Sequence, residues 1–101
     1  MRTILKVRLI KVNSKKVIKE QELQKLKFER VDVSEQESGD KAFHYYTYDI
    51  GNGVISLITQ SNDEVKDNNW HVEVFDDTSI RFETIEDITK FIQVIEKNII
   101  R

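Results

Sequence analysis

Residues 43–60 read FHYYTYDIGNGVISLITQ and carry the strongest β-hairpin signal in the chain. Two runs of β-branched and aromatic residues flank Gly51-Asn52-Gly53, three residues that tolerate the positive φ angles of a tight turn. Apolar side chains fall on both faces of this pair of strands. We therefore expect the hairpin to lie at the centre of an antiparallel sheet.

Further strands are predicted on both sides of this hairpin. Residues 3–12 alternate apolar and basic side chains, which indicates a half-buried strand with a basic outer face. Leu26, Phe28, Val31 and Val33 indicate a second strand with a kink near Arg30, and the polar residues 34–40 that follow it indicate an exposed loop. Residues 70–75 and 80–83 are β-prone and flank a polar turn, so they predict a second hairpin.

The C-terminal region carries the clearest helix signal. Thr84-Ile85-Glu86-Asp87 has the pattern of a capping box, with Asp in place of the usual Glu or Gln. Phe91 and Val94 widen the apolar stripe of this helix, which favours packing on a sheet over a two-heptad dimer seam. The stripe is built from isoleucines at steps of three and four residues: Ile85, Ile88, Ile92, Ile95 and Ile99.

A shorter surface helix is predicted within residues 17–27, which are rich in Lys, Glu and Gln and carry a thin apolar stripe. Together these patterns predict one α+β domain over residues 1–101. Its architecture is an antiparallel sheet of five to six strands, with a short N-terminal helix and a C-terminal helix packed on one face. The sequence leaves monomer and homodimer open.

The composition excludes several classes of protein. The chain has no cysteine, so disulfides and thiolate metal sites are excluded. No run approaches the ~20 apolar residues of a membrane span, and charges interrupt the apolar positions near the N-terminus. We therefore expect a cytoplasmic protein that does not enter a membrane. The absence of proline and the abundance of Ile, Lys and Asn indicate an AT-rich genome.

Charge is segregated along the chain. Residues 1–30 carry ten Lys or Arg against three Glu, whereas residues 31–101 carry fifteen acidic residues against six basic ones. The net charge of −2 therefore conceals two strongly charged parts. Segregated charge of this kind indicates a charged partner, and it does not name the class of that partner.

No catalytic or cofactor motif stands out. His44 and His71 fall on separate hairpins, and a metal site needs three or four converging ligands, so cross-strand histidines are the favoured interpretation. Asp49 and the later Glu64-Val65-Lys66 match the Asp…Glu-x-Lys pattern of metal-dependent nucleases. However, Glu64 and Lys66 fall in a polar stretch, where the mechanism needs a rigid strand edge. We therefore expect no enzymatic activity, no cofactor and no metal.

The expected function is that of a small non-catalytic module that binds another protein. Phages and mobile elements use such modules as accessory, inhibitor or immunity-type proteins. Acidic loops would steer the module toward a basic partner surface. The residues expected to contact the partner are Asp63, Glu64, Asp67, Asp76 and Asp77. Tyr46, Tyr48 and Trp70 have the residue types of interface anchors, but core packing is the favoured interpretation.

The alternative function is nucleic-acid binding through the basic N-terminal strand and turn. Such a stripe would contact phosphates through Lys6, Arg8, Lys11, Lys15 and Lys16. The stripe has no aromatic residue on which bases could stack, since none precedes Phe28. A basic edge strand also protects a sheet against aggregation, which explains the stripe without a ligand.

Overall fold

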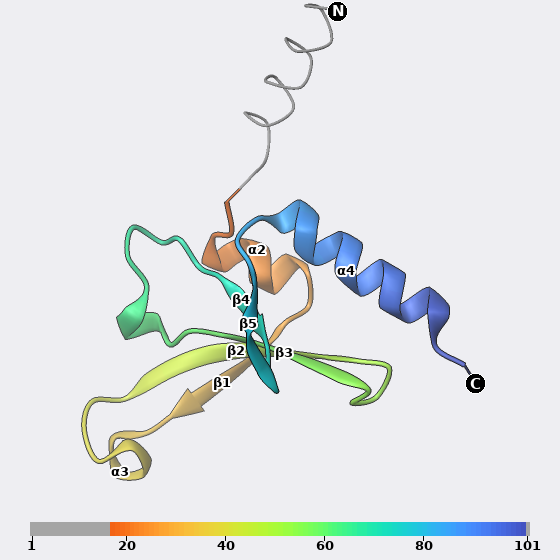
Figure 1. Ribbon diagram of the computed structural model, residues 1–101. Coiled ribbons are helices and arrows are strands. Elements are labelled where there is room, and N and C mark those ends of the chain that lie inside the picture. Colours follow the sequence, from red (N-terminus) through yellow and green to blue (C-terminus); the bar gives the residue numbers. More distant parts are fainter. Residues whose placement is uncertain (1–16, 101) are drawn as a thin grey trace, which may run out of the picture.

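The computed structural model describes residues 17–100 of the chain (Figure 1). In chain order, the elements are α2 (Glu20–Lys25), β1 (Glu29–Val33), α3 (Glu35–Ser38), β2 (Phe43–Ile50), β3 (Ile55–Thr59), the 3-10 helix η1 (Asn62–Glu64), β4 (Val72–Val74), β5 (Asp77–Phe82) and α4 (Ile85–Asn98). The strand predicted at residues 3–12 lies outside the described residues, and so do Lys6, Arg8, Lys11, Lys15 and Lys16.

Within the described residues 17–100, five strands form one antiparallel sheet in chain order, β1-β2-β3-β4-β5. The turn between β2 and β3 has positive φ angles at Gly51, Asn52 and Gly53, as the sequence predicts. β3 is the middle strand and β2 lies beside it, so the central position expected for this hairpin is confirmed. The predicted α+β fold class is likewise confirmed.

Both longer helices pack on the same face of the sheet (Figure 1). From the strands, Tyr46, Ile50, Leu57 and Val72 point into this layer and are almost completely buried. The core also contains Ile18, Leu23, Phe28, Trp70, Ile88 and Ile92. The isoleucine stripe of α4 therefore packs on the sheet, and the core interpretation of Tyr46 and Trp70 is correct. Among the described residues, no helix is long and apolar enough to cross a membrane.

The segment predicted as an exposed loop contains α3, so that prediction is wrong over Glu35–Ser38. A capping box explains the helix. The Ser34 hydroxyl accepts from the Glu37 N–H at 3.3 Å, and Glu37 Oε1 accepts from the Ser34 N–H at 3.1 Å. Gly39 ends the helix in the left-handed region, at a φ of 77°.

Thr84 caps α4, because its hydroxyl oxygen accepts from the Asp87 N–H at 3.3 Å. We expect Thr84→Ala to lower the free energy of unfolding by about 1 kcal/mol, since the amide loses this acceptor. Thr84→Ser keeps an oxygen in the same place and should unfold close to the wild type. Urea unfolding followed by circular dichroism measures both variants. Equal losses for the two variants would show that the hydroxyl does not cap the helix.

Candidate functional site

The face of the sheet opposite the core is open among the described residues. One row of residues crosses all five strands on this face: Glu29, Thr47, Ile58, Glu73 and Arg81. Val31 and Tyr45 lie in the neighbouring row. Figure 1 shows α2 and α4 on the other side of the sheet, with only the short α3 at one end of the open side. We call this surface the open face.

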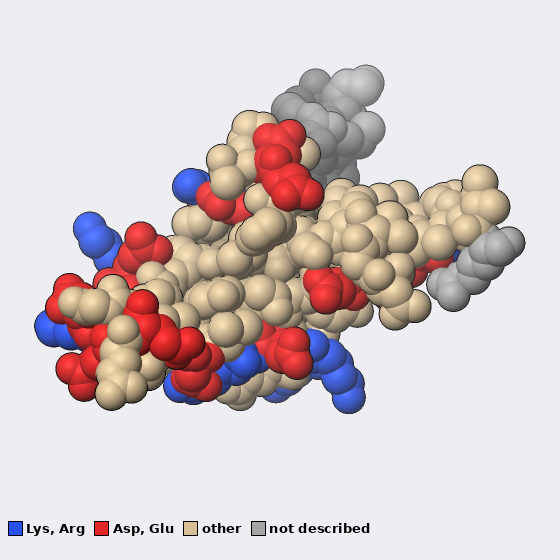
Figure 2. Space-filling model, turned by 90° about the horizontal axis from the view of Figure 1, so that it is seen from below, with Lys and Arg blue, Asp and Glu red and all other residues tan. Residues whose placement is uncertain are grey.

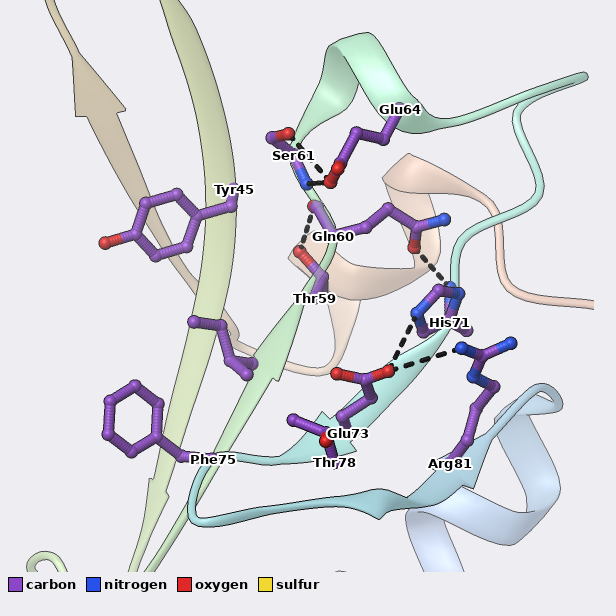
Figure 3. Close-up of a pocket in the computed structure, with 11 residues that line it drawn as sticks. Tyr45, Thr59, Gln60, Ser61, Glu64, His71, Glu73, Phe75, Thr78 and Arg81 are labelled. Carbon is purple, nitrogen blue, oxygen red and sulfur yellow. Dashed lines mark hydrogen bonds and ion pairs between the residues drawn. The ribbon is translucent and has the colours of Figure 1, made fainter. Parts of the chain in front are cut away.

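A hollow of about 660 Å³ lies on the open face over β2, β3, β4 and β5. Figure 3 shows an apolar side formed by Tyr45 and Phe75. Ile58 also lines the hollow and is half-buried. Phe75 is 58% exposed, which is unusual for a large aromatic side chain. The hollow therefore presents accessible aromatic and aliphatic surface.

The polar side of the hollow is centred on Glu73 (Figure 3). His71 Nε2 and Arg81 Nη2 each lie 3.4 Å from Glu73 Oε2. The Glu73 and His71 side chains are 20% exposed, whereas that of Arg81 is 51% exposed. The His71 backbone N–H donates to Gln60 Oε1 at 2.7 Å, which holds the start of β4 against the end of β3. A carboxylate flanked by an imidazole and a guanidinium thus lies beside the apolar side.

The five acidic residues predicted to contact a partner lie in three separate places. Asp63 and Glu64 belong to η1, Asp67 lies in the loop before β4, Asp76 lies in the turn between β4 and β5, and Asp77 is the first residue of β5, which begins before the predicted start at residue 80. Of the five, only Glu64 lines the hollow. These positions do not form one patch.

Several of these carboxylates also stabilise the backbone around them. Glu64 Oε1 accepts from the Ser61 N–H at 3.2 Å and from the Ser61 hydroxyl at 3.0 Å. The hydroxyl and backbone N–H of Ser79 donate to Asp77 and hold the pKa of that carboxyl below its ordinary value. Substitution of these residues therefore changes local structure as well as charge.

Acidic side chains gather at one end of the molecule. Figure 2 looks onto the open face and shows Asp and Glu side chains clustered at the end where α3 lies, with some Lys and Arg side chains among them. Glu35 and Glu37 come from α3, and Asp63 and Glu64 come from η1. The two elements are neighbours, since Glu37 and Asn62 line the same smaller hollow of about 330 Å³. The open face therefore has an acidic margin.

A second polar cluster lies on the helix side of the sheet and joins α2 to β2. His44 Nε2 lies 2.7 Å from Glu20 Oε2, and the Tyr46 hydroxyl donates to the same oxygen at 2.8 Å. Burial opposes ionisation of Glu20, but the hydrogen bonds from His44 and Tyr46 and the charges of His44 and Arg30 outweigh it, so the pKa of Glu20 is lowered. Tyr46 is 1% exposed, and its hydrogen bond to Glu20 ties α2 to the buried side of β2.

The structure keeps the other candidate groups apart. His44 and His71 pair with different glutamates, and no group of three metal-ligating side chains exists in residues 17–100. Asp49 accepts from the Ser56 hydroxyl near the β2–β3 turn. The η1 helix that contains Glu64 meets the other end of β2, where the His44 N–H donates to Asn62. The residues of the nuclease pattern are therefore not assembled.

Most residues of the hollow were not singled out by sequence reasoning for this role. The available signal was the alternation within each strand, which places Tyr45, Ile58 and Glu73 on the side opposite the core. Comparison with known proteins adds no assignment: no protein-family model, curated protein or solved structure matches the chain. The candidate site therefore rests on the geometry of the open face.

Proposed function

We propose that this protein is a small non-catalytic module that binds another protein through the open face of its sheet. One observation supports this most directly: neither α2 nor α4 covers the hollow, which exposed Phe75 lines together with Tyr45, Glu73 and Arg81. Accessible aromatic surface next to arginine and a polar rim is the composition of protein–protein contact sites. An accessory, inhibitor or immunity-type protein of a phage or mobile element would work in this way.

Charge favours a protein partner with a basic surface. Glu29, Asp49 and Glu73 lie on the open face, and the acidic margin adjoins it. Phosphates would be repelled by these carboxylates, whereas lysines and arginines of a partner would be attracted. The aromatic residues of the open face are therefore better suited to protein than to single-stranded nucleic acid.

Affinity capture with matched variants tests this proposal. The tagged protein is incubated with lysate of its source cells, with and without nuclease, and bound proteins are quantified by mass spectrometry. We expect one stoichiometric protein to survive nuclease treatment. The double variant Tyr45→Ala/Phe75→Ala should lower its recovery at least about tenfold, because buried aromatic anchors dominate binding energy. Val94→Ala is the matched control, since Val94 is 51% exposed on α4.

Two results would contradict the proposal. Recovery that is unchanged by Tyr45→Ala/Phe75→Ala would exclude the open face as the contact surface. Recovery that disappears with nuclease would favour the alternative, nucleic-acid binding through Lys6, Arg8, Lys11, Lys15 and Lys16, which lie outside the described residues.

A further inference from the structure

The two carboxylate oxygens of Glu73 differ in their contacts with neighbouring side chains. Both neighbouring side chains, the imidazole of His71 and the guanidinium of Arg81, contact Oε2. Within residues 17–100, no hydrogen bond or ion pair engages the other oxygen, Oε1. Figure 3 shows that oxygen turned toward the side of the hollow on which Tyr45 and Phe75 lie. A half-satisfied acceptor with aromatic surface beside it is suited to a ligand that offers a donor and a flat cationic group.

An arginine side chain has this chemistry. Its guanidinium donates several hydrogen bonds to a carboxylate and stacks on aromatic rings, and its methylenes pack on aliphatic surface. Tyr45 and Phe75 would supply the rings, Ile58 the aliphatic surface and Glu73 the acceptor. We infer that the hollow on the open face receives an arginine side chain of the partner protein. This inference rests on the proposed function and names the chemistry of its partner.

The incoming arginine would compete with Arg81 for Glu73. Arg81 is half exposed, and its Nη1 lies 4.0 Å from Glu83. Its guanidinium therefore has a second carboxylate with which to pair when Glu73 binds the incoming arginine. An acidic side chain of a partner is a poorer occupant. Arg81 already has two carboxylate neighbours, and Glu64 lines the same hollow. Cation binding at Glu73 is therefore favoured over anion binding at Arg81.

Peptide titration of the full chain tests the inference without the partner. The probe is acetyl-Gly-Arg-Gly-amide, and the matched probes carry Lys or Glu in place of Arg. Backbone amide shifts are followed by ¹H–¹⁵N correlation spectra. We expect the arginine probe to bind with a dissociation constant of about 1 mM, because one side chain buries little surface. Its largest shifts should fall on Ile58, Glu73 and Phe75.

Two substitutions should change the affinity for the arginine probe in opposite directions. Glu73→Gln keeps the shape of the side chain and removes its charge, so it should weaken arginine binding about tenfold. Arg81→Gln removes the competing cation and should tighten binding about threefold. Unchanged amide dispersion shows that each variant is folded. If Glu73 had a purely structural role, Arg81→Gln would not increase the affinity for the arginine probe.

Several outcomes would overturn the inference. Tighter or equal binding of the lysine probe would exclude a site specific for guanidinium, and tighter binding of the glutamate probe would place the occupied group at Arg81. If Glu73→Gln leaves the affinity for the arginine probe unchanged, the probe binds at another site.

Affinity capture with Glu73→Gln separates this inference from the proposed function. A partner that is lost with Tyr45→Ala/Phe75→Ala but retained with Glu73→Gln would leave the proposed function intact and remove the arginine site. A partner that is retained with both variants would remove the proposed function itself.

Discussion

Leu57→Ala is expected to lower the free energy of unfolding by about 3 kcal/mol, whereas Ile58→Ala should lower it by no more than about 1 kcal/mol. These two residues are neighbours in β3 and point to opposite faces of the sheet. Leu57 is completely buried, and its strand partners Tyr48 and Val74 belong to the core side. Its truncation leaves a cavity, while Ile58 borders the open hollow.

Urea unfolding of both variants measures this difference, and an unchanged m-value shows that each still unfolds as one unit. The amount of captured partner should change more for Ile58→Ala than for Leu57→Ala, the reverse of the order for stability. Ile58→Ala removes surface from the hollow and should weaken capture, while folded Leu57→Ala should bind like the wild type. Equal losses of stability in the two variants would mean that the two faces of β3 are assigned wrongly.

Removal of the Glu20 carboxylate should have the next largest effect on stability. At about pH 7, we expect Glu20→Gln to lower the free energy of unfolding by about 1–2 kcal/mol, since hydrogen bonds to a charged acceptor are the stronger kind. His44 and Tyr46 both contact this carboxylate. Glu22→Gln is the matched control on the same helix, because within residues 17–100 the Glu22 carboxylate approaches exposed Lys25 at a distance of 3.9 Å.

The effect of Glu20 should also depend on pH in a defined direction. Because the folded-state pKa of Glu20 is lowered from its ordinary value of 4.5, the stabilisation by this carboxylate is fully present above that value. The contribution is lost as the pH falls through the folded pKa, when the carboxylate is protonated in both states. The difference in unfolding free energy between wild type and Glu20→Gln should therefore shrink on acidification. A difference that grows toward acid pH would contradict the assigned direction.

The elements with strong local signals could be predicted from the sequence. The β2–β3 hairpin is specified by its alternation and by the turn at Gly51–Gly53, and α4 is specified by its isoleucine spacing and the Thr84 cap. The α3 helix was missed, although Ser34 and Glu37 have the spacing of a capping box. A helix of four residues has no apolar periodicity by which it could be recognised.

The hollow could not be predicted, because it depends on the pairing of strands that are distant in the chain. Tyr45, Ile58, Glu73 and Arg81 meet only through the registers of four strands. The register between β4 and β5 shifts next to Glu73, and no local pattern indicates such an irregularity. The sequence therefore indicated which residues alternate, but not which residues share a site.

The chain order of the sheet has a consequence for how the protein folds. Each strand pairs with the next strand along the chain, so sheet formation never requires a distant segment to arrive first. The β2–β3 and β4–β5 connections are short, and closing short loops costs little chain entropy. Topologies dominated by such local pairing reach the native state quickly. Within residues 17–100, the long-range steps include the pairing of Ile18 with Trp70 and of Val17 with Thr84, and the packing of α4 on the sheet.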